Sequence, residues 1–298
     1  MKNRRVHVVL IVATLVVVGI VVSAAGLTSQ GQAPRSKTER TVKMTDRPRP
    51  PETKAETNSS PAFNAAASQN VALRNELIWT FGGKQQIGWH LYDLLIGKTV
   101  NTDHDPLSND FAASLSKWQK KSGLGSSGVL DENTLMAMIS QWQRNRLKIR
   151  TPATQDELIL APSSDFYDPS RAPELRQVER KTYEAYKEMI AAAHADRALN
   201  LTSNDKYFKI ISSFRSPEYQ EELRRKSPNA GSAGLAVNSP HFTGRALDIY
   251  VGGSPVDTKD ANRAIQVNTP AYRWLVRNAE RFGFRPYFYE PWHWEYVK

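Results

Sequence analysis

Cysteine is absent from this chain of 298 residues. Its absence excludes disulfide bonds, a lipid-modified cysteine and any metal site built from thiolates. Histidine is also rare, with six in the whole sequence, so few positions are available for imidazole chemistry. The net charge is +10, yet the predicted folded parts carry no stripe of Lys and Arg interleaved with aromatic residues. We therefore expect no nucleic-acid partner, and the basic charge suits an anionic lipid or cell-wall surface.

One long apolar run lies near the N-terminus. Residues 6–22 are almost entirely Val, Ile, Leu, Ala and Gly, and three of the first five residues are Lys or Arg. A basic start, an apolar run and small residues at 22–24 are typical of a signal peptide. The run of seventeen residues is also, at the short end, long enough for an uncleaved membrane anchor. With either interpretation of residues 1–27, we expect the rest of the chain outside the cytoplasm, in the periplasm or cell envelope. An uncleaved segment would make the membrane a partner.

Residues 28–70 are predicted to be a disordered linker. They are rich in Ser, Thr, Pro, Gln, Lys and Glu and contain almost no large apolar side chains. Such a segment cannot bury enough apolar surface to offset the entropy that is lost when a chain becomes ordered. Its expected role is to provide reach from the membrane.

Residues 71–145 are predicted to form a small all-α domain. Phe111, Leu115 and Trp118 recur at the spacing of one helix face. Residues 109–140 show the order helix, Trp-Gln, Gly-Leu, Gly-Val-Leu-Asp and Thr-Leu. This order resembles the peptidoglycan-binding three-helix domain found beside many wall hydrolases, which implies that the domain binds peptidoglycan. A helical packing module without a ligand is the alternative, because fold alone does not determine function.

The C-terminal part of the chain is predicted to be an α+β domain at residues 171–298, after a connector at residues 146–170. Strand-like stretches alternate with amphipathic helices, and prolines mark several helix starts. We expect helices that begin at Pro173, Pro217 and Pro270, and strands at residues 207–214, 245–251 and 286–297. The predicted fold class is a small antiparallel sheet flanked by helices, with the candidate ligands at strand ends.

Two short motifs in this domain carry a candidate metal site. His241 and Asp248 lie seven residues apart with Gly244 between them, and Glu290 precedes His293 by three residues. Two imidazoles and a carboxylate are a ligand set of catalytic zinc, which keeps a further position open for water. A free carboxylate beside the second histidine is the general base that such a water needs. We therefore predict one Zn²⁺ per chain, with Glu290 as the base.

The same motifs carry a family resemblance. The pattern Ser-x-His-x-x-Gly-x-Ala-x-Asp is met by residues 239–248, and Glu-x-x-His is met by residues 290–293. Residues 212–220, SSFRSPEYQ, are similar to a third motif, Ser-x-Tyr-Arg-Ser, with Phe214 in place of the common Tyr. The domain thus resembles the zinc D-alanyl-D-alanine carboxypeptidases related to the vancomycin-resistance carboxypeptidase. This family shares its fold with lysostaphin-type peptidases and the hedgehog signalling domain.

The resemblance also implies how a substrate is held. Arg215 would bind the carboxylate of the terminal residue, for which its planar pair of donors is suited. Gln220 and Ser239 would be further substrate contacts. Glu295 stands where relatives often carry a basic or neutral residue. It shares a face with His293, so we expect it to be a partner of that imidazole.

Three functions follow from these observations. The first is removal of the C-terminal D-alanine from peptidoglycan stem peptides, with DD- or LD-specificity left open. The second is a zinc endopeptidase that cuts within the stem or cross-link, because zinc, base and arginine are compatible with both reactions. The third is a non-catalytic protein that binds the cell wall, against which the complete ligand set and Glu290 argue.

Overall fold

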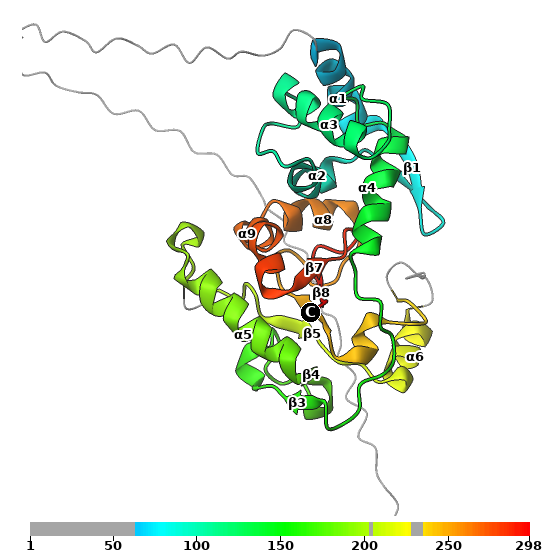
Figure 1. The fold of residues 1–298 in the computed structure, drawn as a ribbon. Helices are drawn as coiled ribbons and strands as arrows, with labels where there is room; N and C mark the ends of the chain where they lie inside the picture. Colours follow the sequence, from blue (N-terminus) through cyan, green and yellow to red (C-terminus); the bar gives the residue numbers. More distant parts are fainter. Residues whose placement is uncertain (1–62, 203–204, 228–234) are drawn as a thin grey trace, which may run out of the picture. The chain divides into compact units, whose positions relative to one another are not determined.

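The computed structural model describes residues 63–202, 205–227 and 235–298 (Figure 1). The predicted signal or anchor segment and most of the predicted linker lie outside these ranges. Among the residues described, no helix is long and apolar enough to cross a membrane.

The sequence predicts an all-α N-terminal domain, but the structure shows a mainly helical module that also contains two strands. Its helices are α1 (Asn64–Glu76), α2 (Asp93–Val100), α3 (Asn109–Lys121) and α4 (Glu132–Arg144). Between α1 and α2 lies an antiparallel hairpin, β1 (Ile78–Phe81) and β2 (Lys84–Ile87). Gly82 and Gly83 both have positive φ in its turn, a conformation that glycine adopts without strain. Helix α1 also begins inside the predicted linker, so the boundary at residue 70 is corrected.

Polar contacts fix the loops of this module. The side chain of Ser108 caps α3 and that of Asp131 caps α4. Gln119, from the Trp-Gln pair of the motif, is buried; it accepts from the Gly128 amide and donates to the Val129 carbonyl and Thr134 hydroxyl. This glutamine therefore serves the internal packing of the module.

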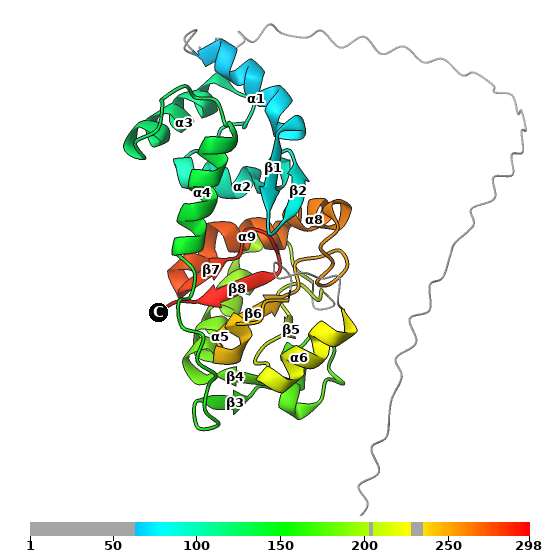
Figure 2. The ribbon, with the colours of Figure 1, turned by 90° about the vertical axis from the view of Figure 1, so that its right-hand side faces the viewer.

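The C-terminal domain is built on a four-stranded antiparallel sheet of order β5-β6-β8-β7 (Figure 2). The strands are β5 (Ile210–Ser212), β6 (Ala246–Ile249), β7 (Phe284–Pro286) and β8 (His293–Tyr296). The single strand predicted at residues 286–297 is thus wrong: residues 287–292 form a connection between β7 and β8. The predicted strands at residues 207–214 and 245–251 contain the shorter β5 and β6.

A second sheet corrects the predicted boundary of this domain. Strand β3 (Leu158–Leu160), from the predicted connector, pairs with β4 (Gln177–Glu179). The helix predicted from Pro173 is instead a short 3₁₀ turn, η4 (Pro173–Leu175), followed by β4 and then α5 (Arg180–Ala195). The Glu179 carboxylate accepts from the Thr182 amide and caps α5, which explains the later start.

Three further helices flank the main sheet. They are α6 (Pro217–Lys226), α8 (Asp260–Val267) and α9 (Pro270–Asn278). Proline occupies the first turn of α6 and α9 as predicted, with Ser216 and Thr269 as side-chain caps. The sequence interpretation missed α8.

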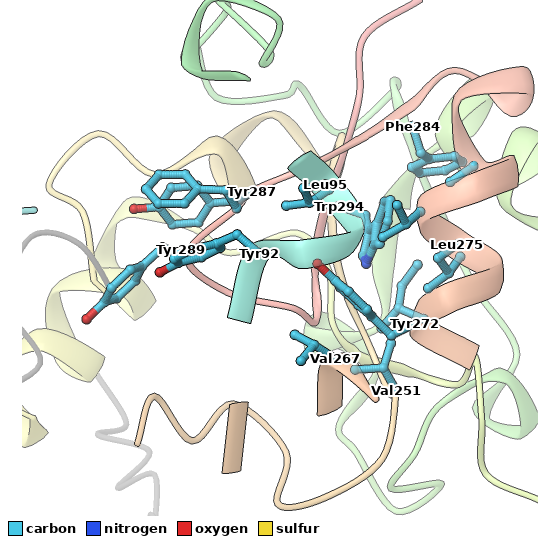
Figure 3. Close-up of a cluster of buried hydrophobic side chains, with 14 of the residues drawn as sticks. Tyr92, Leu95, Val251, Val267, Tyr272, Leu275, Phe284, Tyr287, Tyr289 and Trp294 are labelled. Atoms are coloured by element: carbon cyan, nitrogen blue, oxygen red, sulfur yellow. The ribbon is translucent and has the colours of Figure 1, made fainter. Parts of the chain in front are cut away.

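The helical module packs against the C-terminal domain. Tyr92 and Leu95 belong to the same buried apolar cluster as Tyr272, Leu275 and Trp294 (Figure 3). Polar contacts add to this packing: the Lys98 ammonium donates to the Val276 carbonyl at 2.7 Å, and Arg263 donates to the Tyr92 hydroxyl at 2.5 Å. The segment that follows α4 contacts strand β8 of the main sheet, through Arg146 and Glu295.

Candidate metal centre

Neighbouring strands place two of the three predicted ligands side by side. Asp248 on β6 and His293 on β8 are direct register partners. His241 lies in a short 3₁₀ turn, η6 (Pro240–Thr243), that ends at Gly244. Gly244 has a φ of 64°, and a Cβ there would lie 2.8 Å from the Glu179 amide nitrogen. Only glycine permits this bend, which returns the chain to β6 directly after His241.

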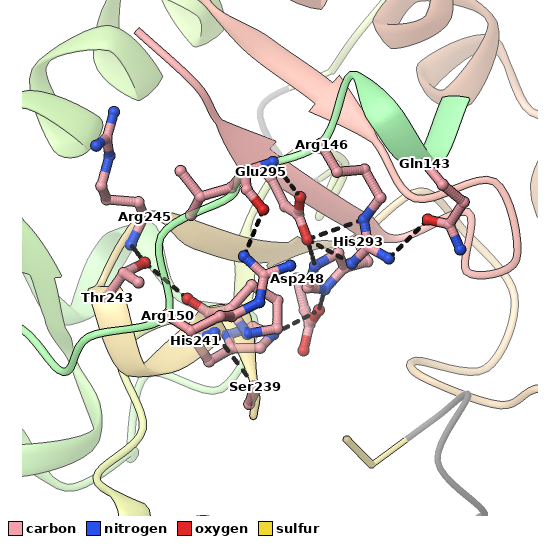
Figure 4. Close-up of polar contacts among 12 residues, drawn as sticks. Gln143, Arg146, Arg150, Ser239, His241, Thr243, Arg245, Asp248, His293 and Glu295 are labelled. Carbon is pink, nitrogen blue, oxygen red and sulfur yellow. Dashed lines mark hydrogen bonds and ion pairs between the residues drawn. The ribbon is translucent and has the colours of Figure 1, made fainter. Parts of the chain in front are cut away.

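The three side chains converge on one point (Figure 4). One ligand atom from each of His241, Asp248 and His293 lies within 4.8 Å of the others. The His241 Nε2 is 3.3 Å from the Asp248 Oδ1, and the His293 Nδ1 is 2.9 Å from the same oxygen. Among the residues that the structure describes, this is the one such group of His, Asp or Glu side chains.

The donor set fits a zinc ion. Ligand atoms about 2.0–2.2 Å from a tetrahedral zinc lie roughly 3.3–3.6 Å from one another, close to the two His–Asp separations given above. The nitrogen that each imidazole turns away from the centre has its own partner: the His241 Nδ1 lies 2.7 Å from the Ser213 carbonyl, and the His293 Nε2 lies 3.2 Å from the Glu295 Oε1. Partners of this kind fix the orientation of metal-binding histidines.

Glu295 is held by the segment that leaves the helical module. Its carboxylate is fully buried. The Oε1 accepts from the Arg146 Nη2 at 2.5 Å and Nε at 3.1 Å, and the Oε2 accepts from the Leu147 amide at 2.9 Å (Figure 4). Arg146 also stacks over the ring of Tyr287, 3.9 Å from its centre. The expected contact between Glu295 and His293 is confirmed, and its support by Arg146 was not predicted.

Burial and charge tune these groups in different directions. Burial lowers the pKa of His241 to about 4, and the nearby Arg215 charge adds to this lowering. This imidazole is therefore neutral at pH 7, the form that binds a metal. Burial raises the pKa of Asp248, but interactions with His241 and Arg215 outweigh it and hold the pKa well below its usual value. The Asp248 carboxylate is thus anionic throughout the physiological range, as a metal ligand must be.

The pKa values of His293 and Glu290 are also shifted. Burial lowers the pKa of His293, but hydrogen bonds to Asp248 and Glu295 outweigh this effect and raise it to about 9. Burial raises the pKa of Glu290 to about 8. A carboxyl with a pKa near neutral pH can both take up and return a proton, as general acid–base catalysis requires.

The three residues predicted to contact the substrate lie around the centre, and each already forms hydrogen bonds within the protein. Arg215 donates from its Nη2 to the Asp248 Oδ2 at 2.5 Å and from its Nε to the Ser212 hydroxyl at 2.9 Å. Gln220 donates to the Ala236 carbonyl at 3.0 Å. The Ser239 hydroxyl accepts from the His241 amide at 3.3 Å and caps its turn.

A cavity of about 400 Å³ adjoins the centre. The three candidate ligands, Glu290, Arg215 and Ser239 all line it; Gln220 lies beside it through its contact with Arg215, at 3.4 Å. Sequence reasoning missed several lining residues that come from separate segments, namely Arg146, Arg171 and Tyr287. Their positions follow from tertiary packing, and no local motif marks them.

A His-Asp-His cluster on a small antiparallel sheet, with a buried glutamate in the adjoining cavity, resembles the arrangement of a metal-dependent hydrolytic site. Residues 175–298 match the family model VanY, D-alanyl-D-alanine carboxypeptidase. Over these residues, which make up less than half of the chain, the sequence is similar to that family. No curated protein matches the chain.

Three solved structures are similar to part of the chain. The LdcB LD-carboxypeptidase is 24% identical, with 49% of this chain and 70% of that chain covered and a TM-score of 0.36. A mutant of the vancomycin-resistance D,D-pentapeptidase VanY in complex with Zn(II) is 22% identical, with 53% and 89% covered and a TM-score of 0.32. VanYB in complex with D-alanine-D-alanine is 24% identical, with 47% and 86% covered and a TM-score of 0.27. Because these TM-scores are low, the similarity to the family rests on the family model.

Proposed function

We propose that the chain is a zinc-dependent carboxypeptidase that removes the C-terminal D-alanine from peptidoglycan stem peptides. The observation that carries this proposal is the convergence of His241, Asp248 and His293 beside Glu290, within a domain similar to the D-alanyl-D-alanine carboxypeptidase family. Fold alone would not support a reaction, but an open ligand set next to a buried acid–base group does.

Each residue has a distinct role in the proposed reaction. The His241 Nε2, the Asp248 Oδ1 and the His293 Nδ1 would hold one zinc ion per chain. When bound, zinc lowers the pKa of a water molecule towards about 7 and polarises the scissile carbonyl. The Glu290 carboxylate takes a proton from the attacking water and returns it to the nitrogen of the leaving D-alanine.

Substrate recognition would use the polar residues around the cavity. Arg215 is proposed to face the terminal carboxylate, with Gln220 and Ser239 as further contacts. Their contacts to the candidate ligand Asp248, to Arg215 and to the His241 amide keep all three near the reacting centre. Both DD- and LD-linked peptides are compatible with these groups.

The rest of the chain would bring the enzyme to its substrate. Residues 1–27 are proposed to act as a signal peptide or anchor, and residues 28 to about 63 as a linker. This arrangement would place the enzyme outside the cytoplasm, in the periplasm or cell envelope. The helical module is proposed to bind peptidoglycan, although its motif residue Gln119 also has an internal role.

Metal analysis combined with mass spectrometry of digested muropeptides tests the proposal. The wild-type protein should contain one zinc per chain and shorten stem peptides by one terminal alanine. His241→Ala should lose the zinc, whereas Glu222→Gln, in a solvent-accessible ion pair on α6, should match the wild type. Cleavage inside the stem or cross-link would identify an endopeptidase instead. Unchanged muropeptides with a zinc-loaded protein would contradict a catalytic role.

A further inference from the structure

Three arginines line the cavity beside the candidate metal centre, and they differ in how their charge is balanced. Arg146 is paired with Glu295, and Arg215 is paired with Asp248, both at 2.5 Å. Arg171 forms no ion pair with any carboxylate in the described ranges of the chain. A partly buried guanidinium without a counter-ion, beside a cavity, is suited to bind an anion.

The position of Arg171 is fixed by its backbone and by one edge of its side chain. Its amide donates to the Asp168 carbonyl at 3.2 Å, and its own carbonyl accepts from the Arg176 Nε at 3.1 Å. The Arg171 Nε donates to the Leu175 carbonyl at 3.0 Å. Its two terminal nitrogens have no hydrogen-bond partner among the described residues, so this edge of the guanidinium remains available to a ligand.

The electrostatics agree with an uncompensated charge. Burial is the largest effect and lowers the pKa of Arg171; the interaction with Tyr219 partly raises it, the charge of Arg215 lowers it again, and Asp248 raises it by less. Arg171 nevertheless stays protonated, because arginine remains charged at all physiological pH values. An anion in the cavity would relieve the repulsion between the two guanidinium groups.

The geometry points to Arg171 as the residue that recognises the negative charge of the substrate's terminal carboxylate and so makes the site prefer a free acid. This inference rests on the proposed function and divides the work between two arginines. Arg215, proposed above to face the same carboxylate, already donates from its Nε to Ser212 and from its Nη2 to Asp248. Its charge is therefore balanced, and it would contribute a hydrogen bond to the carboxylate rather than a net charge. Arg171 supplies the free charge and the planar pair of donors that a carboxylate requires.

A pair of matched substrates tests this assignment. We would measure kcat and KM for an acetylated lysyl-D-alanyl-D-alanine tripeptide and for the same peptide with a C-terminal carboxamide. The wild type should prefer the acid by about 10- to 100-fold, the usual range for a charge-assisted hydrogen bond. Arg171→Ala should lose this preference through a higher KM for the acid, with little change for the amide. Arg171→Lys should restore part of it.

Arg180→Ala serves as the matched control, since Arg180 is an exposed arginine at the start of α5. It should keep the wild-type ratio of acid to amide. The ratio compares two substrates in one protein, so a partly destabilised variant still gives a valid answer. If Arg171→Ala keeps the wild-type ratio, the inference is wrong, whatever its absolute rates are.

A binding measurement separates this inference from the proposed function. Calorimetry of both peptides with a Glu290→Gln variant, with and without Arg171→Ala, reports recognition without turnover. Should the wild type cleave neither these peptides nor their LD-linked counterparts while the acid still binds more tightly through Arg171, the proposed function fails and the inference stands. Should the wild type cleave the acid while Arg171→Ala binds acid and amide with the wild-type preference, the inference fails and the function stands.

Discussion

Replacement of Glu295 by glutamine tests how the metal centre is supported. Glu295 is fully buried, lies 3.2 Å from the His293 Nε2, and receives two hydrogen bonds from Arg146 and one from the Leu147 amide. Glutamine keeps the size and removes the charge. The imidazole then loses its anionic partner, and the Arg146 guanidinium, which is 15% exposed, loses its counter-ion.

The expected loss can be estimated from each contact. Loss of a carboxylate partner behind a metal-binding histidine typically lowers metal affinity about 10- to 100-fold. This corresponds to about 1.4–2.8 kcal/mol of binding free energy. The broken ion pair should also lower the free energy of unfolding of the metal-free protein, by up to about 3 kcal/mol, because Arg146 is left with an unpaired, mostly buried charge.

Chelator competition gives the zinc Kd of both proteins, at a temperature well below the unfolding of either. The zinc-induced gain in stability should shrink by the same free energy, since ligand binding stabilises the folded state in proportion to the logarithm of affinity. Glu222→Gln is the control, as it removes the same charge from an exposed ion pair. A zinc Kd for Glu295→Gln within about twofold of the wild type would refute the reasoning.

Two further substitutions test contacts that stabilise the fold. Gly244→Ala should lower the free energy of unfolding by about 1–3 kcal/mol, because alanine is strained at a φ of 64° and its Cβ would meet the Leu158 side chain at 2.8 Å. Gly125→Ala, which has open space around its Cβ, should leave the melting temperature unchanged. Burial raises the pKa of Glu280, but the charges of Lys98 and Arg285 outweigh it and the net pKa lies below its usual value. Glu280 therefore stabilises the protein above its unfolded pKa, and this contribution is lost as the pH falls through the folded pKa. Thermal unfolding of the wild type and Glu280→Gln should thus differ at pH 7 and converge in acid; a difference that persists in acid would contradict the pairing.

The candidate ligands could be identified from sequence because their motifs are local. His241 and Asp248 are joined by a glycine whose positive φ allows the bend, and His293 follows Glu290 within one short segment. The register between β6 and β8 then brings Asp248 and His293 together. The structure places the predicted residues in one cluster; their catalytic roles remain proposals.

Residues contributed by distant segments could not be predicted. Arg146 follows a helix in a different module, and Arg171 lies in an irregular loop; neither belongs to a recognisable pattern. The errors in secondary structure have similar causes. The position of Val178 fits the apolar face of a helix as well as a strand. In the structure Val178 pairs with Ile159 and belongs to a strand. In the sequence, the Gly82-Gly83 pair indicates the end of a helix. In the structure, these two residues form the turn of a hairpin.

Release of D-alanine by matched zinc-loaded proteins tests the central claim most directly. Wild type and Glu290→Gln would be loaded to equal zinc content and incubated with a synthetic stem peptide that ends in D-alanyl-D-alanine. The wild type should release free D-alanine. Glu290→Gln should bind zinc equally well but release D-alanine at least about 100-fold more slowly. Equal rates from the two proteins, or no release by the wild type from either DD- or LD-linked peptides, would contradict the account.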